Sequence, residues 1–312
     1  MFVEVLVLLV HQLSNALNED QANCYRYLLV DPLKPVKIVE PLALENIKDV
    51  FSSDEFKAIL RPDLSYEPTI CPHLILLAKP GEVLEPELLD LTITRIEKER
   101  SHYKHYICAW ISSELDIQNL AEKMIDLGLQ LGRLLSPKQP TFLPFYEHIR
   151  LQLLKESLSV ERLLSGLFNF IHRYTYMNYY GQLIQIKAAD NLLTKDFLLS
   201  SQIFLQNALQ YQNEPKATFG LVKMWQDNIQ TLPPNALFLS AKKLLDAKNI
   251  GFTNLEDRLV YALYCLIYQV DLITIETISP HILSAILAPG SLKKRLEQLE
   301  NDIKASINQN NN

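Results

Sequence analysis

The distribution of proline is the feature that most restricts how this chain of 312 residues can fold. Eight prolines fall between residues 32 and 86, and proline then becomes scarce for a long stretch beyond about residue 155. A proline removes a backbone donor and its ring clashes with the preceding helical turn, so long helices cannot pass through closely spaced prolines. The sequence therefore predicts short strands and loops in the first region and helices in the second.

Hydrophobic periodicity locates the elements of the first region. Continuous or alternating apolar residues predict strands, and apolar residues three and four apart predict helices. A capping pattern at Ser113 and Asp116 marks the start of one of these helices. On these grounds we predict strands over residues 24–31, 73–78 and 105–111, and helices over residues 2–17, 86–100 and 117–131.

Beyond about residue 155 helical spacing dominates, interrupted by one predicted strand at residues 183–186. The pattern indicates an α+β fold class, in which an N-terminal α/β lobe with a small mixed sheet precedes a mainly α-helical C-terminal lobe. We place the first lobe at residues 1–155 and the second at residues 156–305. The polar, asparagine-rich segment 306–312 is predicted to be a disordered tail.

Composition and charge exclude several classes of protein. The net charge of −6 argues against a nucleic-acid partner, which requires concentrated positive charge. The apolar stretch at residues 1–10 lacks a basic flank, contains Glu4 and is too short to insert in a membrane, so a cytoplasmic location is expected. Buried free thiols in a reducing compartment are predicted for all four cysteines, which are Cys24, Cys71, Cys108 and Cys265.

Motifs for cofactors and metals are missing from the sequence. It contains no G-x-G-x-x-G or Walker loop, no G-x-S-x-G elbow and no H-E-x-x-H pair. Gly128 and Gly132 form a G-x-x-x-G, but the charged residues around them do not suit a membrane helix. His102, His105 and Cys108 form the most ligand-like cluster, yet residues three apart on a strand face opposite ways. We therefore predict no cofactor and no metal.

Two further features suggest binding or catalysis. Asp31, at the end of a predicted strand, is the best single catalytic candidate, although a turn role before Pro32 is favoured. Tyr174, Tyr176 and Tyr179 lie in the densest aromatic segment, and such residues are common at protein interfaces. The alternative for these tyrosines, that alternate rings pack between the two lobes, stays open.

Several segments occur in an order that carries a resemblance. An apolar strand ends in Leu29-Val30-Asp31, a Pro-x-Leu strand follows at residues 72–76, and Trp110-Ile111-Ser112-Ser113 precedes an amphipathic helix. Next come Phe145, Tyr146, Glu147 and Arg150, and the second lobe carries Ala247, Gly251, Asp257 and an apolar seam at residues 292–299. In this order the segments resemble the adaptor-chaperone family of the bacterial type VI secretion system.

The family carries an Arg-Phe-Tyr-Asp-Pro-Arg motif at the start of a helix. In this sequence Pro144 replaces the first Arg, His148 replaces the Pro, and Arg150 is displaced by one residue. The resemblance implies a non-catalytic adaptor that binds a secreted toxin effector and helps to load it onto the secretion tip spike. The alternatives are a hydrolytic enzyme built around Asp31 or Glu147, and an immunity protein that binds a toxin.

The candidate partner-binding residues combine the resemblance with the tyrosine-rich segment. They are Asp31, Phe145, Tyr146, Glu147, Arg150, Tyr174, Tyr176 and Tyr179.

Overall fold

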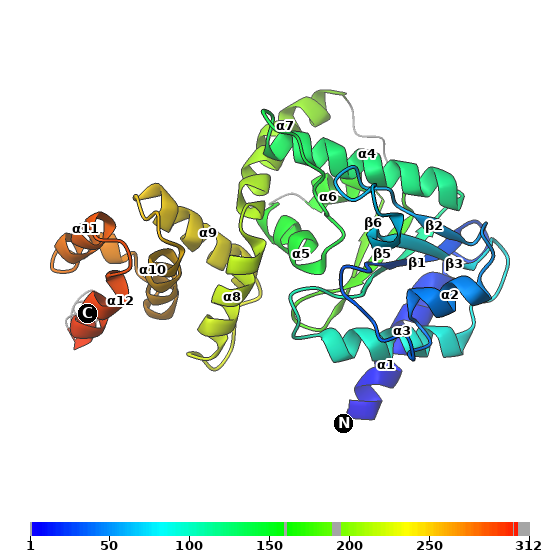
Figure 1. Cartoon of the computed structure of the whole chain (residues 1–312), viewed down its shortest axis with the longest axis horizontal. Helices are drawn as coiled ribbons and strands as arrows, with labels where there is room; N and C mark the ends of the chain where they lie inside the picture. Colours follow the sequence, from blue (N-terminus) through cyan, green and yellow to red (C-terminus); the bar gives the residue numbers. More distant parts are fainter. Residues whose placement is uncertain (1, 159–160, 189–194, 302, 305–312) are drawn as a thin grey trace. The chain divides into compact units, whose positions relative to one another are not determined.

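A computed structural model describes residues 2–158, 161–188, 195–301 and 303–304 (Figure 1). Contacts within the chain divide it into two compact units, Met1–Gln212 and Asn213–Asn312. We call them the sheet unit and the helical unit. We predicted a boundary after residue 155, and the structure divides the chain later, after Gln212. The predicted tail at 306–312 lies outside the described residues.

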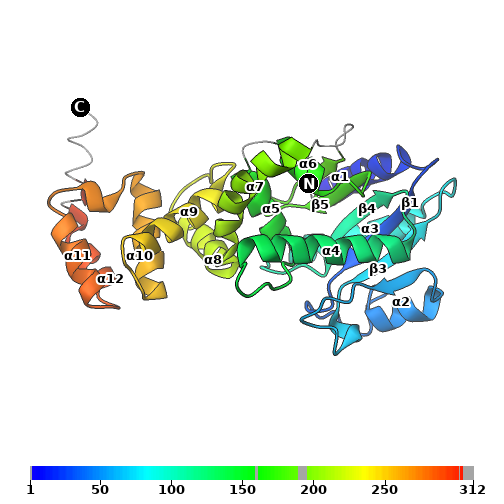
Figure 2. The same cartoon turned by 90° about the horizontal axis from the view of Figure 1, so that it is seen from above.

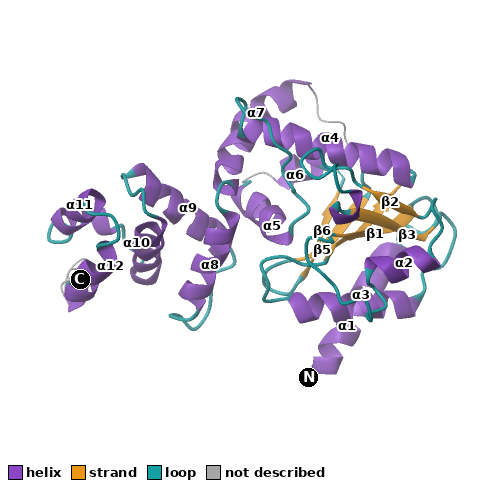
Figure 3. Ribbon diagram, viewed as in Figure 1, coloured by secondary structure: helices purple, strands orange, loops and turns teal. Residues whose placement is uncertain are grey.

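A six-stranded sheet forms the centre of the sheet unit, with the strand order β2-β3-β1-β4-β5-β6 (Figure 3). Every described pairing is antiparallel. The α+β class is therefore confirmed, but the sheet is antiparallel rather than mixed, because each strand runs opposite to every strand with which it pairs. The strands are β1 (Tyr25–Val30), β2 (Phe56–Ala58), β3 (His73–Ala78), β4 (Ile107–Ser113), β5 (Arg173–Met177) and β6 (Leu183–Lys187).

Helices cover both faces of this sheet, with α4 on one side and α1 and α3 on the other (Figure 1). Figure 2 shows the same elements from above. Alternation along β1 places Tyr27 and Leu29 in the core beneath one helical layer, and Leu28 and Val30 in the core beneath the other. The first layer contains α4 (Ile117–Leu135), α5 (His148–Ser157), α6 (Glu161–Leu167) and α7 (Lys195–Leu209). The second contains α1 (Phe2–Asn18), α2 (Leu44–Val50) and α3 (Pro86–Glu99), and two 3-10 turns, η1 (Pro68–Ile70) and η2 (Gln210–Gln212), complete the unit.

The strands predicted from apolar runs are confirmed as β1, β3, β4 and β6, with small differences at their ends. The short edge strand β2 and the strand β5 were not predicted. Since β5 pairs with β4, residues beyond 155 complete the sheet instead of beginning a separate lobe. The capping pattern also differs in detail: Asp116 is the N-cap of α4 and accepts a hydrogen bond from the Asn119 amide, whereas Ser113 ends β4.

The helical unit packs around its own apolar cluster. Asn254 caps one of its helices, and the buried Asp257 carboxylate accepts hydrogen bonds from the backbone amides of Gly290 and Leu292. The acidic helix start that contributed to the resemblance thus anchors a loop. The helices are α8 (Pro215–Gln226), α9 (Ala236–Asn249), α10 (Leu255–Tyr268), α11 (Ser279–Leu287) and α12 (Leu292–Gln298), with one 3-10 turn, η3 (Leu272–Thr274).

The structure also bears on the cysteines and on the apolar helices of the chain. All four cysteines are buried and free, as predicted. Within the described residues, no helix has both the length and the apolar character required to cross a bilayer.

Candidate functional site

Phe145 and Tyr146 precede α5 and are buried. The Phe145 ring packs edge-on against Phe168, with 5.7 Å between ring centroids. Arg61 reaches the same place from the loop after β2 and donates a hydrogen bond of 2.6 Å to the Tyr146 hydroxyl. These two aromatic residues were predicted to bind a partner. The correction is that both belong to the core, because the segment turns inward before α5 begins.

Arg61 is held from several sides. Its guanidinium pairs with Asp63 at 2.6 Å and lies 5.0 Å from the centroid of the Phe142 ring. Burial raises the pKa of the Tyr146 hydroxyl well above its ordinary value, so Tyr146 stays neutral and accepts from Arg61. Sequence reasoning did not identify Arg61, because Tyr146 and Phe142, which it contacts, come from a distant segment.

Glu147 joins two cations. Its carboxylate oxygens lie 2.8 Å from Lys104 Nζ and 2.9 Å from Arg150 Nε. Arg150 also donates to the Gln212 carbonyl, and the Gln212 side chain donates back to the Arg150 carbonyl, both at 3.0 Å. The structure therefore brings Glu147 and Arg150 together, although Arg150 is displaced by one residue from its position in the family motif. They connect the start of α5 to the loop before β4 and to the last residue of the sheet unit.

Asp31 is buried, with 1 % of its surface exposed, and interacts electrostatically with Lys104 and Glu147. Its carboxylate accepts a hydrogen bond of 3.0 Å from the Leu33 amide, which confirms the predicted turn role at Pro32. Burial raises the pKa of Asp31 to about 6, and the Glu147 carboxylate acts in the same direction, whereas Lys104 opposes them. We refer to Asp31, Arg61, Lys104, Tyr146, Glu147 and Arg150 as the polar centre.

A stacked histidine pair lies in the same part of the sheet unit. The His105 and His148 rings are parallel within 4°, with centroids 3.5 Å apart. Burial lowers the pKa of His105 to about 3 and that of His148 well below its ordinary value, so both rings are neutral near pH 7. His102 is exposed and Cys108 is buried. In the described part of the chain, no group of three or more His, Cys, Asp or Glu side chains is arranged to hold a metal ion.

The predicted tyrosine surface is also corrected. Tyr174 and Tyr176 lie on β5 and are buried in the core of the sheet unit, while Tyr179 is half-buried beyond the strand. The Tyr176 hydroxyl donates a hydrogen bond of 2.8 Å to the Gln152 side chain on α5. Tyr174 and Tyr176 alternate as residues on one face of a strand do, and this signal could have identified β5, all five residues of which are buried.

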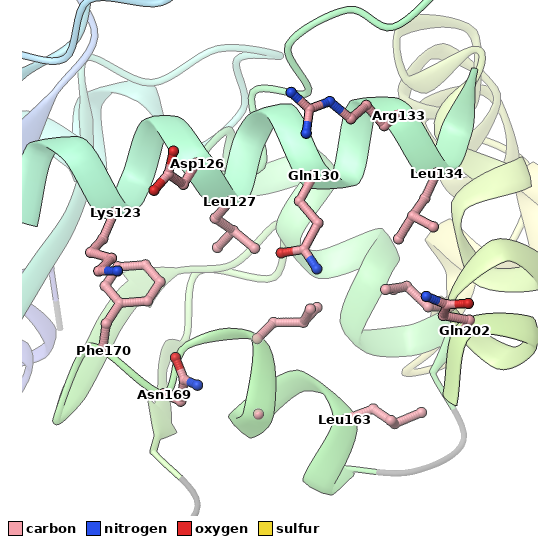
Figure 4. A pocket seen from close by; sticks show the side chains of 13 residues that line it. Lys123, Asp126, Leu127, Gln130, Arg133, Leu134, Leu163, Asn169, Phe170 and Gln202 are labelled. Carbon is pink, nitrogen blue, oxygen red and sulfur yellow. The ribbon is translucent and has the colours of Figure 1, made fainter. Parts of the chain in front are cut away.

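An open groove lies between α4, α6 and α7 (Figure 4). Its cavity volume is about 600 Å³, and most of the surface that lines it is apolar. The lining residues are Lys123, Asp126, Leu127, Gln130, Arg133, Leu134, Leu163, Gly166, Leu167, Asn169, Phe170, Gln202 and Leu205. We call this feature the groove.

Figure 4 shows which side chains of α4 point into the groove. Leu127, Gln130 and Leu134 point from α4 into the open space, and the Arg133 side chain rises on the other side of the helix (Figure 4). Lys123 and Phe170 lie at one end of it. Sequence reasoning missed the groove because apolar residues at helical spacing are usually core. One signal was available: α4 carries apolar residues on more of its circumference than a single buried stripe requires.

Comparison of the chain with protein-family models, curated proteins and solved structures finds no match. The geometry of the polar centre and the groove, together with the resemblance seen in the sequence, is therefore the basis for a functional proposal.

Proposed function

We propose that this chain is a non-catalytic adaptor-chaperone of the type VI secretion system, which binds a secreted toxin effector in the cytoplasm and helps to load it onto the tip spike. The observation that carries this proposal is the groove. An adaptor needs an accessible apolar surface that can hold a segment of another protein, and the half-buried side chains of Leu134, Leu167 and Phe170 provide one.

The two carboxylates of the polar centre are not placed for catalysis. Glu147 is already engaged by Lys104 and Arg150, and Asp31 is buried in a turn. A general acid or base must reach its substrate within hydrogen-bond distance. Glu147 links Lys104 to Arg150 at the start of α5, and Asp31 closes the turn after β1. Of the two regions, the groove is the one that is accessible to a partner.

The test is co-expression of the full chain with the toxin encoded beside its gene, followed by size-exclusion chromatography and measurement of toxin solubility and activity. We expect co-elution and a several-fold higher soluble yield of active toxin, and the isolated complex should then bind the purified spike protein. Loss of toxin activity in the complex would favour the immunity alternative. If the toxin remains insoluble and does not co-elute, the adaptor proposal is wrong.

A further inference from the structure

The shape of the groove restricts what can occupy it. Its wall on α4 runs from Lys123 to Leu134, which is about 16 Å at the helical rise of ~1.5 Å per residue. This length corresponds to roughly three turns of a helix. The other walls are α6, the turn that follows it, and α7. The groove therefore suits a short rod of protein lying along α4.

The walls also favour a helix over an extended segment. No strand contributes to the described lining, so no sheet edge offers a row of backbone partners. An extended segment would bury unpaired backbone amides and carbonyls against leucine side chains, which is costly. A helix satisfies these groups internally and presents only side chains to the leucines.

Charges at one end of the groove set a direction. Lys123 and Asp126 lie one turn apart on α4, and both are exposed. Neither side chain forms an ion pair with another of the described residues. A partner helix with an acidic residue and, one turn along, a basic residue would complement this pair.

We infer that the groove binds the apolar stripe of one amphipathic helix of the toxin, with an acidic side chain of that helix against Lys123 and a basic side chain against Asp126. This inference rests on the proposed function and makes it more specific. The apolar anchors of the partner helix occur at intervals of three and four residues and pack against Leu134, Leu167 and Phe170, which are the half-buried apolar residues of the lining. Gln130, which points into the groove, pairs with a polar group at the margin of that stripe.

Site-specific photocrosslinking in the co-expressed complex tests the inference directly. A photoreactive phenylalanine analogue is placed at Gln130 or Gln202, which line the groove, and at Glu122 as a control that is exposed on α4 outside the lining. We expect crosslinks from the two groove positions to a single toxin segment with helical apolar spacing. The Glu122 position should give at least fivefold fewer crosslinks.

Two substitutions complete the test. Leu134→Glu should weaken toxin binding by about tenfold or more, because it places a charge in the apolar groove. Leu91→Glu, at an exposed leucine of α3 in the other helical layer, should leave binding unchanged. Lys123→Glu should weaken binding by about three- to tenfold, and reversing the acidic residue identified by crosslinking should restore it.

The outcomes separate the inference from the proposed function. If the complex forms but neither groove position crosslinks, or the crosslinked segment lacks helical spacing, the inference is wrong while the adaptor proposal stands. A bound lipid found by mass spectrometry of the purified chain, with no crosslink to the toxin, also overturns the inference. If no complex forms at all, the proposed function itself fails. The crosslinking result remains decisive even if Leu134→Glu does not fold.

Discussion

The polar centre and the groove lie in the same compact unit but differ in what they bury. The polar centre buries charged side chains, whereas the groove leaves leucine side chains partly accessible. In the polar centre, ionisable groups such as Glu147 and Asp31 are buried and partnered. In the groove, Leu134 and Leu167 line an accessible surface, and Lys123 remains exposed at its end. Buried charge is tolerated where partners compensate its desolvation, whereas open apolar surface is a marker of binding.

Helix α4 links the two regions. One side of it lines the groove, and the other side carries Gly128 and Gly132, against which the segment 141–143 lies. The Leu143 amide donates a hydrogen bond of 3.0 Å to the Gly128 carbonyl. This segment leads directly into Phe145 and Tyr146. The G-x-x-x-G of the sequence thus permits close approach of a loop within the unit.

The largest effect is expected from Gly132→Ala. A Cβ atom at this position would lie 1.5 Å from the Thr141 carbonyl oxygen, and a backbone atom cannot rotate away. Either α4 or the segment 141–143 must shift, so we expect the free energy of unfolding to fall by about 3 kcal/mol. Urea denaturation measures this change.

The matched control for this change is Gly220→Ala on α8. Nothing lies within 4 Å of the Cβ position at Gly220, so the change should be neutral or stabilise the protein by up to about 1 kcal/mol. Equal destabilisation by the two alanines would contradict the close approach at Gly132. If Gly132→Ala also lowers toxin binding, the groove depends on the position of α4.

The structure explains which parts of this arrangement were predictable. Strands β3 and β4 contain continuous apolar runs, and β1 combines aromatic and aliphatic residues around Arg26, so local sequence was sufficient to predict them. The pairing of Ser112 with Arg173 joins residues far apart in the chain, and no local pattern encodes it. The tyrosine-rich segment was therefore interpreted as a partner surface or as packing between two lobes, although the alternation of Tyr174 and Tyr176 was a local sign of a strand. The pairing of β5 with β4 places the predicted boundary, after residue 155, inside the sheet unit.

The candidate site divides in the same way. Local motifs drew attention to Asp31, Glu147 and Arg150, which the structure does bring together. Their partners Arg61 and Lys104 come from other loops, and single-sequence reasoning has no means to assign them. The groove is a property of the spacing between helices, so leucines that line it resemble core leucines in the sequence.

The next largest effect concerns Asp31 and depends on pH. Its folded pKa of about 6 lies above the ordinary value of 3.8, so the folded state holds the proton more tightly than the unfolded state between these pH values. The free energy of unfolding should therefore decrease as pH rises from about 4 to about 6. A difference of roughly two pKa units corresponds to about 2–3 kcal/mol.

Asp31→Asn isolates this contribution. The amide can keep the acceptor for the Leu33 amide but cannot ionise, so the variant should gain stability relative to the wild type as pH rises. We expect the difference between the two proteins, measured by denaturation at pH 4 and pH 7, to change by about 2–3 kcal/mol in favour of the variant. A constant difference across this range would show that Asp31 is not desolvated in the folded state.

The smallest effect on the free energy of unfolding is expected from Gln130→Ala. The same substitution at Gln152 serves as the comparison. Gln130 is exposed in the groove, whereas Gln152 on α5 is buried and accepts a hydrogen bond from Tyr176. Gln152→Ala leaves the Tyr176 hydroxyl without its acceptor and should cost about 1–3 kcal/mol. Gln130→Ala should change the free energy of unfolding by less than about 0.5 kcal/mol.

Denaturation of both variants at pH 7 gives the change in the free energy of unfolding that the same substitution causes at Gln130 and at Gln152. If Gln130→Ala were as destabilising as Gln152→Ala, the groove would be part of the packed core and would not be available to a partner. If Gln130→Ala leaves stability unchanged and lowers toxin binding, its amide contributes to recognition alone. The groove would then differ from the polar centre in a measurable way, because its side chains affect binding without affecting the free energy of unfolding.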